Sequence, residues 1–278
     1  MVINMLILYI IAALILISAL GYIFVLARPC GRISDRLLTD YAHRGLHNDK
    51  IPENSLTAFE RAIDAGFGIE LDVQLSRDGE VMVFHDYSLE RMTGRNAKLC
   101  ELSAAELSEL RLGGTDERIP RFDELLELVN GRVPLLIELK GESLDASLCP
   151  KVAELLRSYK GEYCVESFNP MLLFRFAKLC PEVTRGILYT NVCREKHRVN
   201  ILNLLLGCMA LNFLARPAFI AYDERYAGAF PVKLCTKFYR AGRFVWTIRS
   251  RESFERARSE GAHTIFEGFV PDRTESEK

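Results

Sequence analysis

Acidic side chains alternate with apolar ones in two segments that otherwise have the character of buried β-strands. Glu70 and Asp72 flank Leu71, and Glu138 and Lys140 lie at the end of a second apolar run. Successive side chains of a strand point to opposite faces, so both members of each pair should project to one side. Because an unpaired buried charge costs several kcal/mol, packing alone does not explain these strands. The three carboxylates favour a hard divalent cation, Mg²⁺ or Ca²⁺, with a salt-bridge cluster around Lys140 as the alternative.

Two histidines also follow strand-like segments. His43 comes after the short run 41–42, and His85 comes after the run 81–84. Since the unperturbed pKa of histidine lies near neutrality, the pair is suited to acid–base catalysis. Arg44 offers a planar, always-charged fork that fits a phosphate group. Together these side chains indicate a site that handles a phosphorylated compound.

The order and spacing of several short motifs resemble the glycerophosphodiester phosphodiesterase family. The resemblance covers roughly residues 41–271, nearly everything after the N-terminal apolar run. The motifs are His43-Arg44-Gly45, Pro52-Glu53-Asn54-Ser55 with Ala58-Phe59, Glu70-Leu71-Asp72-Val73, Arg77-Asp78-Gly79, His85-Asp86, Leu89-Glu90-Arg91-Met92-Thr93-Gly94, Ile119-Pro120, Ile137-Glu138-Leu139-Lys140, Ser167-Phe168 and Trp246-Thr247-Ile248.

The resemblance implies a TIM barrel that hydrolyses glycerophosphodiesters to glycerol 3-phosphate and an alcohol. Related enzymes are thought to let the glycerol 2-hydroxyl attack phosphorus, giving a cyclic phosphate that water then opens. Carried over by motif, the residues take four roles. Glu70, Asp72 and Glu138 would bind one divalent cation, His43 and His85 would be the acid–base pair, Arg44 and Lys140 would hold the phosphate, and Trp246 is a further candidate for substrate contact.

Three positions depart from the family pattern. Arg249 stands where Asn is usual, Glu267-Gly268 stands where Thr-Asp is favoured, and His263 stands where an Asp is common. The motifs place none of them among the metal or acid–base residues. We therefore expect the departures to affect the substrate headgroup pocket and not the catalytic set.

Beyond about residue 40, short β-rich runs alternate with amphipathic stretches, which predicts a parallel sheet with crossover helices. About 240 residues remain there, close to the roughly 250 of a typical (β/α)₈ barrel. Nine runs are candidate strands although a barrel needs eight, so one is misassigned or lies outside it. They are Tyr41–Ala42, Gly68–Val73, Val81–Phe84, Pro134–Leu139, Tyr163–Val165, Gly186–Tyr189, Met209–Phe213, Phe244–Ile248 and Thr264–Phe266.

Residues Met5 to Ala27 are uncharged and almost wholly apolar. At about 1.5 Å per residue, a helix of this length spans the roughly 30 Å hydrocarbon core of a bilayer. A cleaved signal peptide and a buried core helix are the alternatives. We expect an anchor over residues 1–28, a linker over 29–39, the barrel over 40–271 with a small insertion at 86–120, and a tail at 272–278. A chain starting near Arg36 should then fold without the anchor.

Arg28, Arg32 and Arg36 follow the apolar run, and no Lys or Arg precedes it. The positive-inside rule therefore predicts a single-pass membrane protein with a cytoplasmic catalytic domain. A net charge of −1 does not suggest nucleic acid as a partner, and no obligate protein partner is evident.

Two further functions stay open. One is lysophospholipase D-type cleavage of membrane lysophospholipids on the same barrel, which an anchor would favour. The other is a catalytically inert, membrane-tethered binding protein, which would be expected to have lost members of the catalytic set. A membrane-dipping surface near Phe213 to Phe219 is also open.

Overall fold

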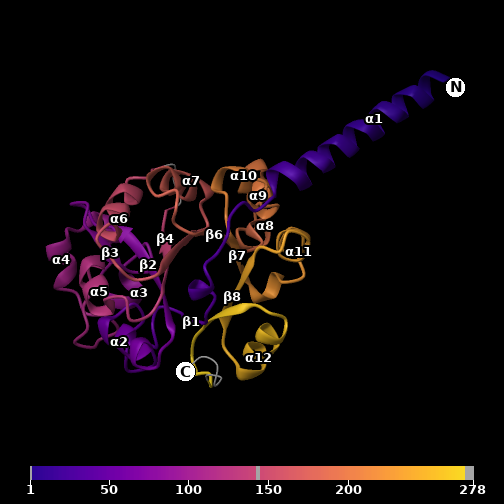
Figure 1. Cartoon of the computed structure of the whole chain (residues 1–278). Coiled ribbons are helices and arrows are strands. Elements are labelled where there is room, and N and C mark those ends of the chain that lie inside the picture. The colour runs from indigo at the N-terminus through magenta and orange to yellow at the C-terminus, as the bar shows by residue number, and fades with distance from the viewer. Residues whose placement is uncertain (1, 142–144, 273–278) are drawn as a thin grey trace.

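The computed structural model describes residues 2–141 and 145–272 and contains a closed (β/α)₈ barrel (Figure 1). Eight parallel strands close because β1 pairs with β2 on one side and with β9 on the other. The strands are β1 (Tyr41–Ala42), β2 (Gly68–Leu75), β4 (Leu135–Leu139), β5 (Tyr163–Ser167), β6 (Arg185–Tyr189), β7 (Phe219–Asp223), β8 (Gly242–Ile248) and β9 (His263–Phe266). The predicted TIM barrel is confirmed.

Two of the nine predicted strands do not belong to the barrel. β3 (Val81–Val83) is a strand, but it pairs antiparallel with β2 and lies outside the closed ring. The prediction of a strand at Met209–Phe213 is wrong. Met209 has a positive φ of 52° after a helix, and a further helical turn follows at Asn212–Ala215. The sixth barrel strand is β7 instead, which starts after Pro217.

Helices cover the outside of the barrel, and α2 shows why they form where they do. Its apolar residues Phe59, Ala62 and Ile63 recur at helical spacing and are buried, Ser55 caps its first turn, and Gly66 follows its end at a φ of 73°. The longer helices are α2 (Leu56–Asp64), α5 (Phe122–Val129), α6 (Leu148–Leu156), α7 (Pro170–Leu179), α9 (Ile201–Gly207) and α12 (Arg251–Ser259). The short ones are α3 (Glu90–Thr93), α4 (Ala104–Ser108), α8 (Val192–Glu195), α10 (Asn212–Ala215), α11 (Phe230–Lys233) and the helical turns η1 (Tyr22–Leu26), η2 (Asp35–Leu37), η3 (Leu99–Glu101), η4 (Glu224–Tyr226) and η5 (Leu234–Phe238).

The strands bury side chains on both faces, as a barrel requires. Leu71 lies in the layer between strands and helices, while Leu136, Phe219 and Phe244 fill the lower interior of the barrel. At Gly186 an added Cβ would lie 1.9 Å from the Phe219 ring, so the floor accepts only glycine there. Polar side chains occupy the layers above this floor, toward the carboxyl ends of the strands.

Residues 29–39, expected to be a linker, pack against the floor of the barrel. Leu37 is 2% exposed and belongs to the interior cluster, and Ile33 packs against the same cluster. The Tyr41 hydroxyl donates to the Leu37 carbonyl oxygen at 3.0 Å. A chain starting at Arg36 would keep Leu37 and lose Ile33 from this floor, and its folding without the anchor stays a prediction.

Residues 86–120 form a small unit beside β3, with their own apolar cluster that includes Leu89, Leu99 and Leu107. Figure 1 shows α3 and α4 on the side of the barrel opposite to α1. Because this segment follows β2 and β3, it brings Arg91 to the barrel mouth beside His85, which lies directly before it. The tail predicted at 272–278 lies, after Asp272, outside the described residues.

The N-terminal helix α1 (Val2–Gly21) projects away from the barrel (Figure 1). Residues Asn4–Leu26 have a mean hydropathy of 2.6 and are not buried by the rest of the chain. Its end is nevertheless fixed to the barrel. Ala27 is fully buried, and its carbonyl oxygen accepts hydrogen bonds from the Asn212 amide at 2.8 Å and the Cys235 thiol at 3.3 Å. The helix thus leaves the barrel at α10 and η5.

Candidate active site

Three buried carboxylates meet inside the barrel mouth. Glu70 and Asp72 lie on β2, and Glu138 lies on β4 directly beside Asp72 in the strand register. One oxygen from each lies within 4.8 Å of the others. The alternation around Leu71 thus brings together the three side chains expected to share a cation.

Two cations face this acidic group. Lys140 Nζ lies 3.1 Å from Glu138 Oε1 and 3.3 Å from Asp72 Oδ1, and Arg44 Nε lies 3.5 Å from Asp72 Oδ2. The Arg44 backbone N–H donates to Glu70 Oε2 at 3.0 Å. Arg44 adopts a φ of 54° in the turn after β1, and this turn points both its amide and its guanidinium into the site.

Burial and neighbouring charge drive the carboxyl pKa values apart. Burial raises the pKa of Glu138 to about 7 and the pKa of Glu70 well above its usual range. Burial also opposes ionisation of Asp72, but Lys140 and Arg44 hold its pKa below the ordinary value. The positive charge of Lys140 and Arg44 is thus enough to keep one of the three carboxyl groups ionised, but not all three.

This shortage of positive charge fits a divalent cation. Asp72 Oδ1 is buried without a hydrogen-bond partner among the described residues, although Lys140 lies 3.3 Å away. A hard cation with oxygen ligands would allow Glu70 and Glu138 to ionise beside Asp72. Chemistry and placement of the donor atoms therefore agree with Mg²⁺ or Ca²⁺.

His43 is held by Glu267, which the sequence analysis assigned to the substrate headgroup pocket. Its Nδ1 is hydrogen-bonded to Glu267 Oε2, and its Nε2 faces Glu70 at 4.0 Å. Arg249 Nε binds the other Glu267 oxygen at 2.7 Å. Two departures from the family pattern therefore reach the acid–base set, and our expectation that they lie apart from it is wrong. His263 does lie away, with its ring 5.5 Å from that of Phe244.

His85 is oriented in the same manner from the other side of the site. Its Nδ1 lies 2.6 Å from Asp86 Oδ1, and Arg91 Nε binds Asp86 Oδ2 at 2.5 Å. Arg91 and Arg44 share Glu53 Oε1, each at 2.7 Å. In both histidines, Nδ1 is thus hydrogen-bonded to a carboxylate. Burial lowers the pKa of His43 and of His85.

Glu166 is a fourth buried acid that the sequence reasoning missed. It lies on β5 beside Glu138 in the register, is 1% exposed, and has one oxygen without a hydrogen-bond partner among the described residues. Burial raises its pKa well above the usual range. Alternation with Cys164 could have revealed it, but the predicted strand ended at Val165.

Trp246 lies on the interior face of β8 and contacts the Phe168 ring edge-to-face, with centroids 5.7 Å apart. Its indole N–H donates to the Ala221 carbonyl oxygen at 3.0 Å. The polar group of Trp246 is therefore engaged by the barrel, and its ring contacts Phe168.

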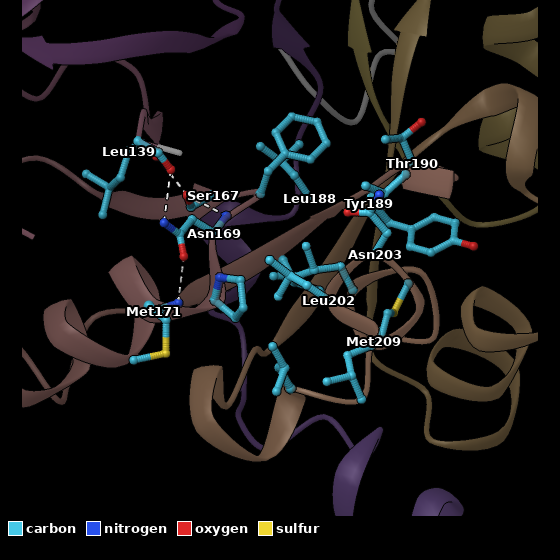
Figure 2. Close-up of a pocket in the computed structure, with 18 of the residues that line it drawn as sticks. Leu139, Ser167, Asn169, Met171, Leu188, Tyr189, Thr190, Leu202, Asn203 and Met209 are labelled. Carbon is cyan, nitrogen blue, oxygen red and sulfur yellow. Dashed lines mark hydrogen bonds between the residues drawn. The ribbon is translucent and has the colours of Figure 1, made fainter. Parts of the chain in front are cut away.

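A cavity of about 640 Å³ adjoins the site and was not foreseen from the sequence. It reaches Glu138 and Lys140 at one end and is lined by α9 side chains at the other. Figure 2 shows Leu202 and Met209 facing it from the side opposite to Ser167 and Asn169. Asn169 caps α7 through the Met171 amide at 3.0 Å, which fixes this wall. The site therefore has a polar end and a largely apolar extension.

Fold and site together define a TIM-barrel protein whose strand ends carry three clustered carboxylates and two carboxylate-paired histidines. The family model described as "Glycerophosphoryl diester phosphodiesterase family" matches residues 43–270. The chain therefore belongs to that family, and the resemblance read from the motifs is confirmed.

Individual relatives agree with this assignment. A glycerophosphodiester phosphodiesterase of Caldanaerobacter subterraneus subsp. tengcongensis is 35% identical over 159 residues, which is 53% of this chain and 65% of that protein. This chain thus spans slightly less than two thirds of that relative. A lysophospholipase D of Rattus norvegicus is 33% identical over 44% of this chain and 42% of its own length. The crystal structure of a glycerophosphodiester phosphodiesterase from Thermotoga maritima is similar at a TM-score of 0.65 and 29% identity, over 82% of this chain and 94% of that one.

Replacing Glu267 by Gln should lower kcat by roughly one to two orders of magnitude. The substitution removes the carboxylate charge that orients His43 and stabilises its protonated form. The Glu267 carboxylate raises the pKa of His43 against the effect of burial. Its loss should therefore shift that pKa further down. If His43 is the base, the acidic limb of the kcat/KM profile moves to lower pH. If His43 is the acid, the alkaline limb moves to lower pH.

Arg249→Asn is the matched control, since it restores the usual family residue and changes an exposed partner of the same carboxylate. It should shift the limbs far less than Glu267→Gln does, because Arg249 is 66% exposed and solvent screens its charge. A Glu267→Gln profile that coincides with the wild-type profile would show that Glu267 does not act on His43.

Proposed function

We propose that this chain is a metal-dependent phosphodiesterase that hydrolyses glycerophosphodiesters to glycerol 3-phosphate and an alcohol. The observation that carries the proposal is the convergence of three carboxylates with two carboxylate-paired histidines at one barrel mouth. Membership of the family supports it. A catalytically inert binding protein would not need such a set of side chains, so the site favours the enzyme over that alternative.

In this proposal Glu70, Asp72 and Glu138 hold the divalent cation. When bound, the cation supplies charge neutralisation at the phosphate oxygens. Arg44 and Lys140 lie beside the same carboxylates and bind the phosphate through charge-assisted hydrogen bonds. Phosphoryl transfer depends mainly on alignment and on stabilisation of the phosphate charge. Arg44 and Lys140 contribute to both by binding the phosphate oxygens.

The histidines move the protons. One takes the proton of the glycerol 2-hydroxyl as its oxygen bonds to phosphorus, and the other protonates the alcohol oxygen as its bond to phosphorus breaks. Water then opens the resulting cyclic phosphate, with the two roles reversed. Glu267 and Asp86 keep each Nδ1 occupied, so that each Nε2 exchanges protons with the substrate.

Release of glycerol 3-phosphate from a small panel of soluble diesters, such as glycerophosphocholine and glycerophosphoglycerol, tests the proposal. The His197→Ala variant should retain full activity, since His197 is exposed and absent from the site. Absence of product from every diester with either cation present would overturn the proposed activity.

The apolar cavity favours a second substrate class, lysophospholipids cleaved in the manner of a phospholipase D. Its volume of about 640 Å³ lies within the usual range for ligand sites, and α9 lines it with leucines. One hydrocarbon chain could lie there while the phosphate lies at Lys140. The resemblance to a lysophospholipase D over part of the chain agrees with this substrate class.

Introducing Asp at Leu202 or Leu205 should raise KM for a lysophospholipid by about 10-fold or more, because burial of a leucine-sized contact is worth roughly 1.5–3 kcal/mol. KM for the matching glycerophosphodiester should stay the same. Leu179→Asp is the control, since Leu179 is an exposed leucine that does not line the cavity. Equal effects on both substrates would exclude the cavity as a chain site.

We also propose that α1 is a single-pass anchor and that the catalytic domain is cytoplasmic. Tyr22 and Ile23 hydrogen-bond to the barrel, and Ala27 is buried in it, which favours a retained helix over a cleaved leader. In intact cells, external protease should leave the barrel uncut and should cut it after permeabilisation. Cutting in intact cells would reverse the orientation, and release of the barrel as a shortened soluble chain would indicate a signal peptide.

A further inference from the structure

Several large apolar side chains are exposed on the part of the barrel that holds α1. Ile201 and Leu204 of α9 are 78% and 49% exposed, and Phe230 of α11 and Phe238 of η5 are 62% and 61% exposed. We call these four residues the apolar surface. Several large exposed apolar side chains in one region of a folded domain mark a contact with a partner or with lipid.

The apolar surface lies beside the end of the anchor helix. The Tyr22 ring stacks on Phe230 with centroids 6.4 Å apart, and its hydroxyl donates to the carbonyl oxygen of Cys208, one residue beyond α9. The Tyr239 hydroxyl, next to Phe238, donates to the Ile23 carbonyl oxygen at 2.8 Å. Figure 1 shows α8, α9, α10 and α11 grouped around the base of α1.

Basic residues dominate the same part of the chain. Residues 192–240 contain eight Lys or Arg and three Asp or Glu, whereas the whole chain has a net charge of −1. The three acids are in ion pairs: Asp223 and Glu195 with Arg225, and Glu224 with Arg256. The exposed basic side chains in this region include Arg198, Lys233, Lys237 and Arg240. Anionic lipid headgroups are the complement of such a surface.

We propose that the apolar surface inserts into the headgroup boundary of an anionic bilayer leaflet, with the surrounding basic side chains on the lipid phosphates. The proposal rests on the anchor proposed above, because the leaflet is the one at which α1 leaves the membrane. Apolar side chains with a basic border are the pattern of interfacial helices, which enter the bilayer by about 5–10 Å.

Insertion would also place the catalytic cavity at the membrane. Leu205 and Leu206 of α9 line that cavity, whereas Ile201 and Leu204 of the same helix do not. Helix α9 therefore contributes side chains both to the cavity and to the apolar surface. A substrate from the leaflet would reach the site across α9 without crossing bulk water.

The membrane-dipping surface left open at Phe213 to Phe219 coincides with this region only in part. Phe213 is 42% exposed on α10, but Phe219 is fully buried in the floor of the barrel. The lipid contact is therefore expected on α9, α11 and η5 and not along the strand that follows Pro217.

Tryptophan quenching in the full chain tests the contact. Single substitutions Ile201→Trp and Phe238→Trp are reconstituted into vesicles of phosphatidylcholine and phosphatidylglycerol, part of which carries bromine on the acyl chains. The only native tryptophan, Trp246, lies on the interior face of β8 and gives the background. Leu14→Trp in α1 is the positive control, and Ala105→Trp on α4, far from α1, is the negative control.

The expected result is loss of emission from Ile201→Trp and Phe238→Trp with bromine near the headgroup end of the chains, and less with bromine near the methyl end. Leu14→Trp should be quenched by chain bromine and Ala105→Trp by neither. If Leu14→Trp is quenched while both surface variants match Ala105→Trp, the surface does not touch lipid and the anchor proposal stands. If Leu14→Trp is not quenched either, the anchor proposal fails first. If Ile201→Trp and Phe238→Trp escape quenching only at high protein-to-lipid ratios, a second copy of the chain covers the surface. That result would overturn the proposal.

Discussion

His43→Ala and His85→Ala should each lower kcat by about 10²–10⁴-fold on a natural diester, because each removes one positioned proton transfer. KM should change far less, since Arg44 and Lys140 still bind the phosphate. Both histidines are partly buried and each is fixed by a carboxylate, and His47 Nε2 lies 3.8 Å from the same Glu267 oxygen that holds His43. Steady-state kinetics on glycerophosphocholine measures the two parameters separately.

A substrate with a nitrophenol leaving group separates the two roles. Its leaving oxygen needs little protonation, so the variant without the acid should recover most of its rate. The variant without the base should not recover. Near wild-type turnover by either alanine variant on a natural diester would remove that histidine from the mechanism. Equal rescue of both would keep the pair and refute the division of roles.

Removal of divalent cations should abolish turnover, and Mg²⁺ or Ca²⁺ should restore it. Binding should also stabilise the fold, by about 2.7 kcal/mol when the free cation is a hundredfold above its Kd. Thermal unfolding with and without cation measures this independently of activity. Glu70→Gln should lose both the activation and the thermal shift while remaining folded. Glu127→Gln on the exposed face of α5 should behave as the wild type.

The cation affinity should fall as the pH falls, because protons and the cation compete for the same oxygens. Without cation, burial raises the pKa of Glu138 to about 7. Glu138 is therefore largely ionised above pH 7 and must lose a proton to bind below it, so the apparent Kd should increase as pH falls through this value. Full activity after exhaustive chelation, or a thermal shift that persists in Glu70→Gln, would contradict the proposed cation site.

Local patterns were enough to predict most of the barrel. Seven of the nine predicted strands coincide with strands of the barrel. The error at Met209–Phe213 has a physical cause. An apolar run of that length fits a buried strand or a short helix equally well, and the choice depends on Asn212, which bonds to Ala27 some 185 positions away. No local pattern reports a contact of that kind.

The site was predictable where strand alternation carries the information. Glu70, Asp72 and Glu138 meet as expected because β2 and β4 are adjacent and in register. Glu267 was not assigned to His43, although it alternates with Ile265 on an inward-facing strand. Its role depends on the closure of β9 onto β1, which is a pairing of the two ends of the barrel. The cavity depends on how α9 packs over the strands. The leucines of α9 would look the same in the sequence whether they lined a cavity or filled a hydrophobic core.

The attachment at Ala27 means that α1 could not readily be exchanged for the N-terminal helix of another protein. Enzymes tethered by a flexible stalk tolerate exchange of their anchors, because the stalk transmits no orientation. Here the Asn212 amide and the Cys235 thiol hold the Ala27 carbonyl oxygen, and two tyrosine hydroxyls hold the preceding turn. An inserted residue after Ile23 would rotate the helix by about 100° relative to the barrel. The first 27 residues and the barrel should therefore vary together among related chains, as parts of one architecture and not as exchangeable modules.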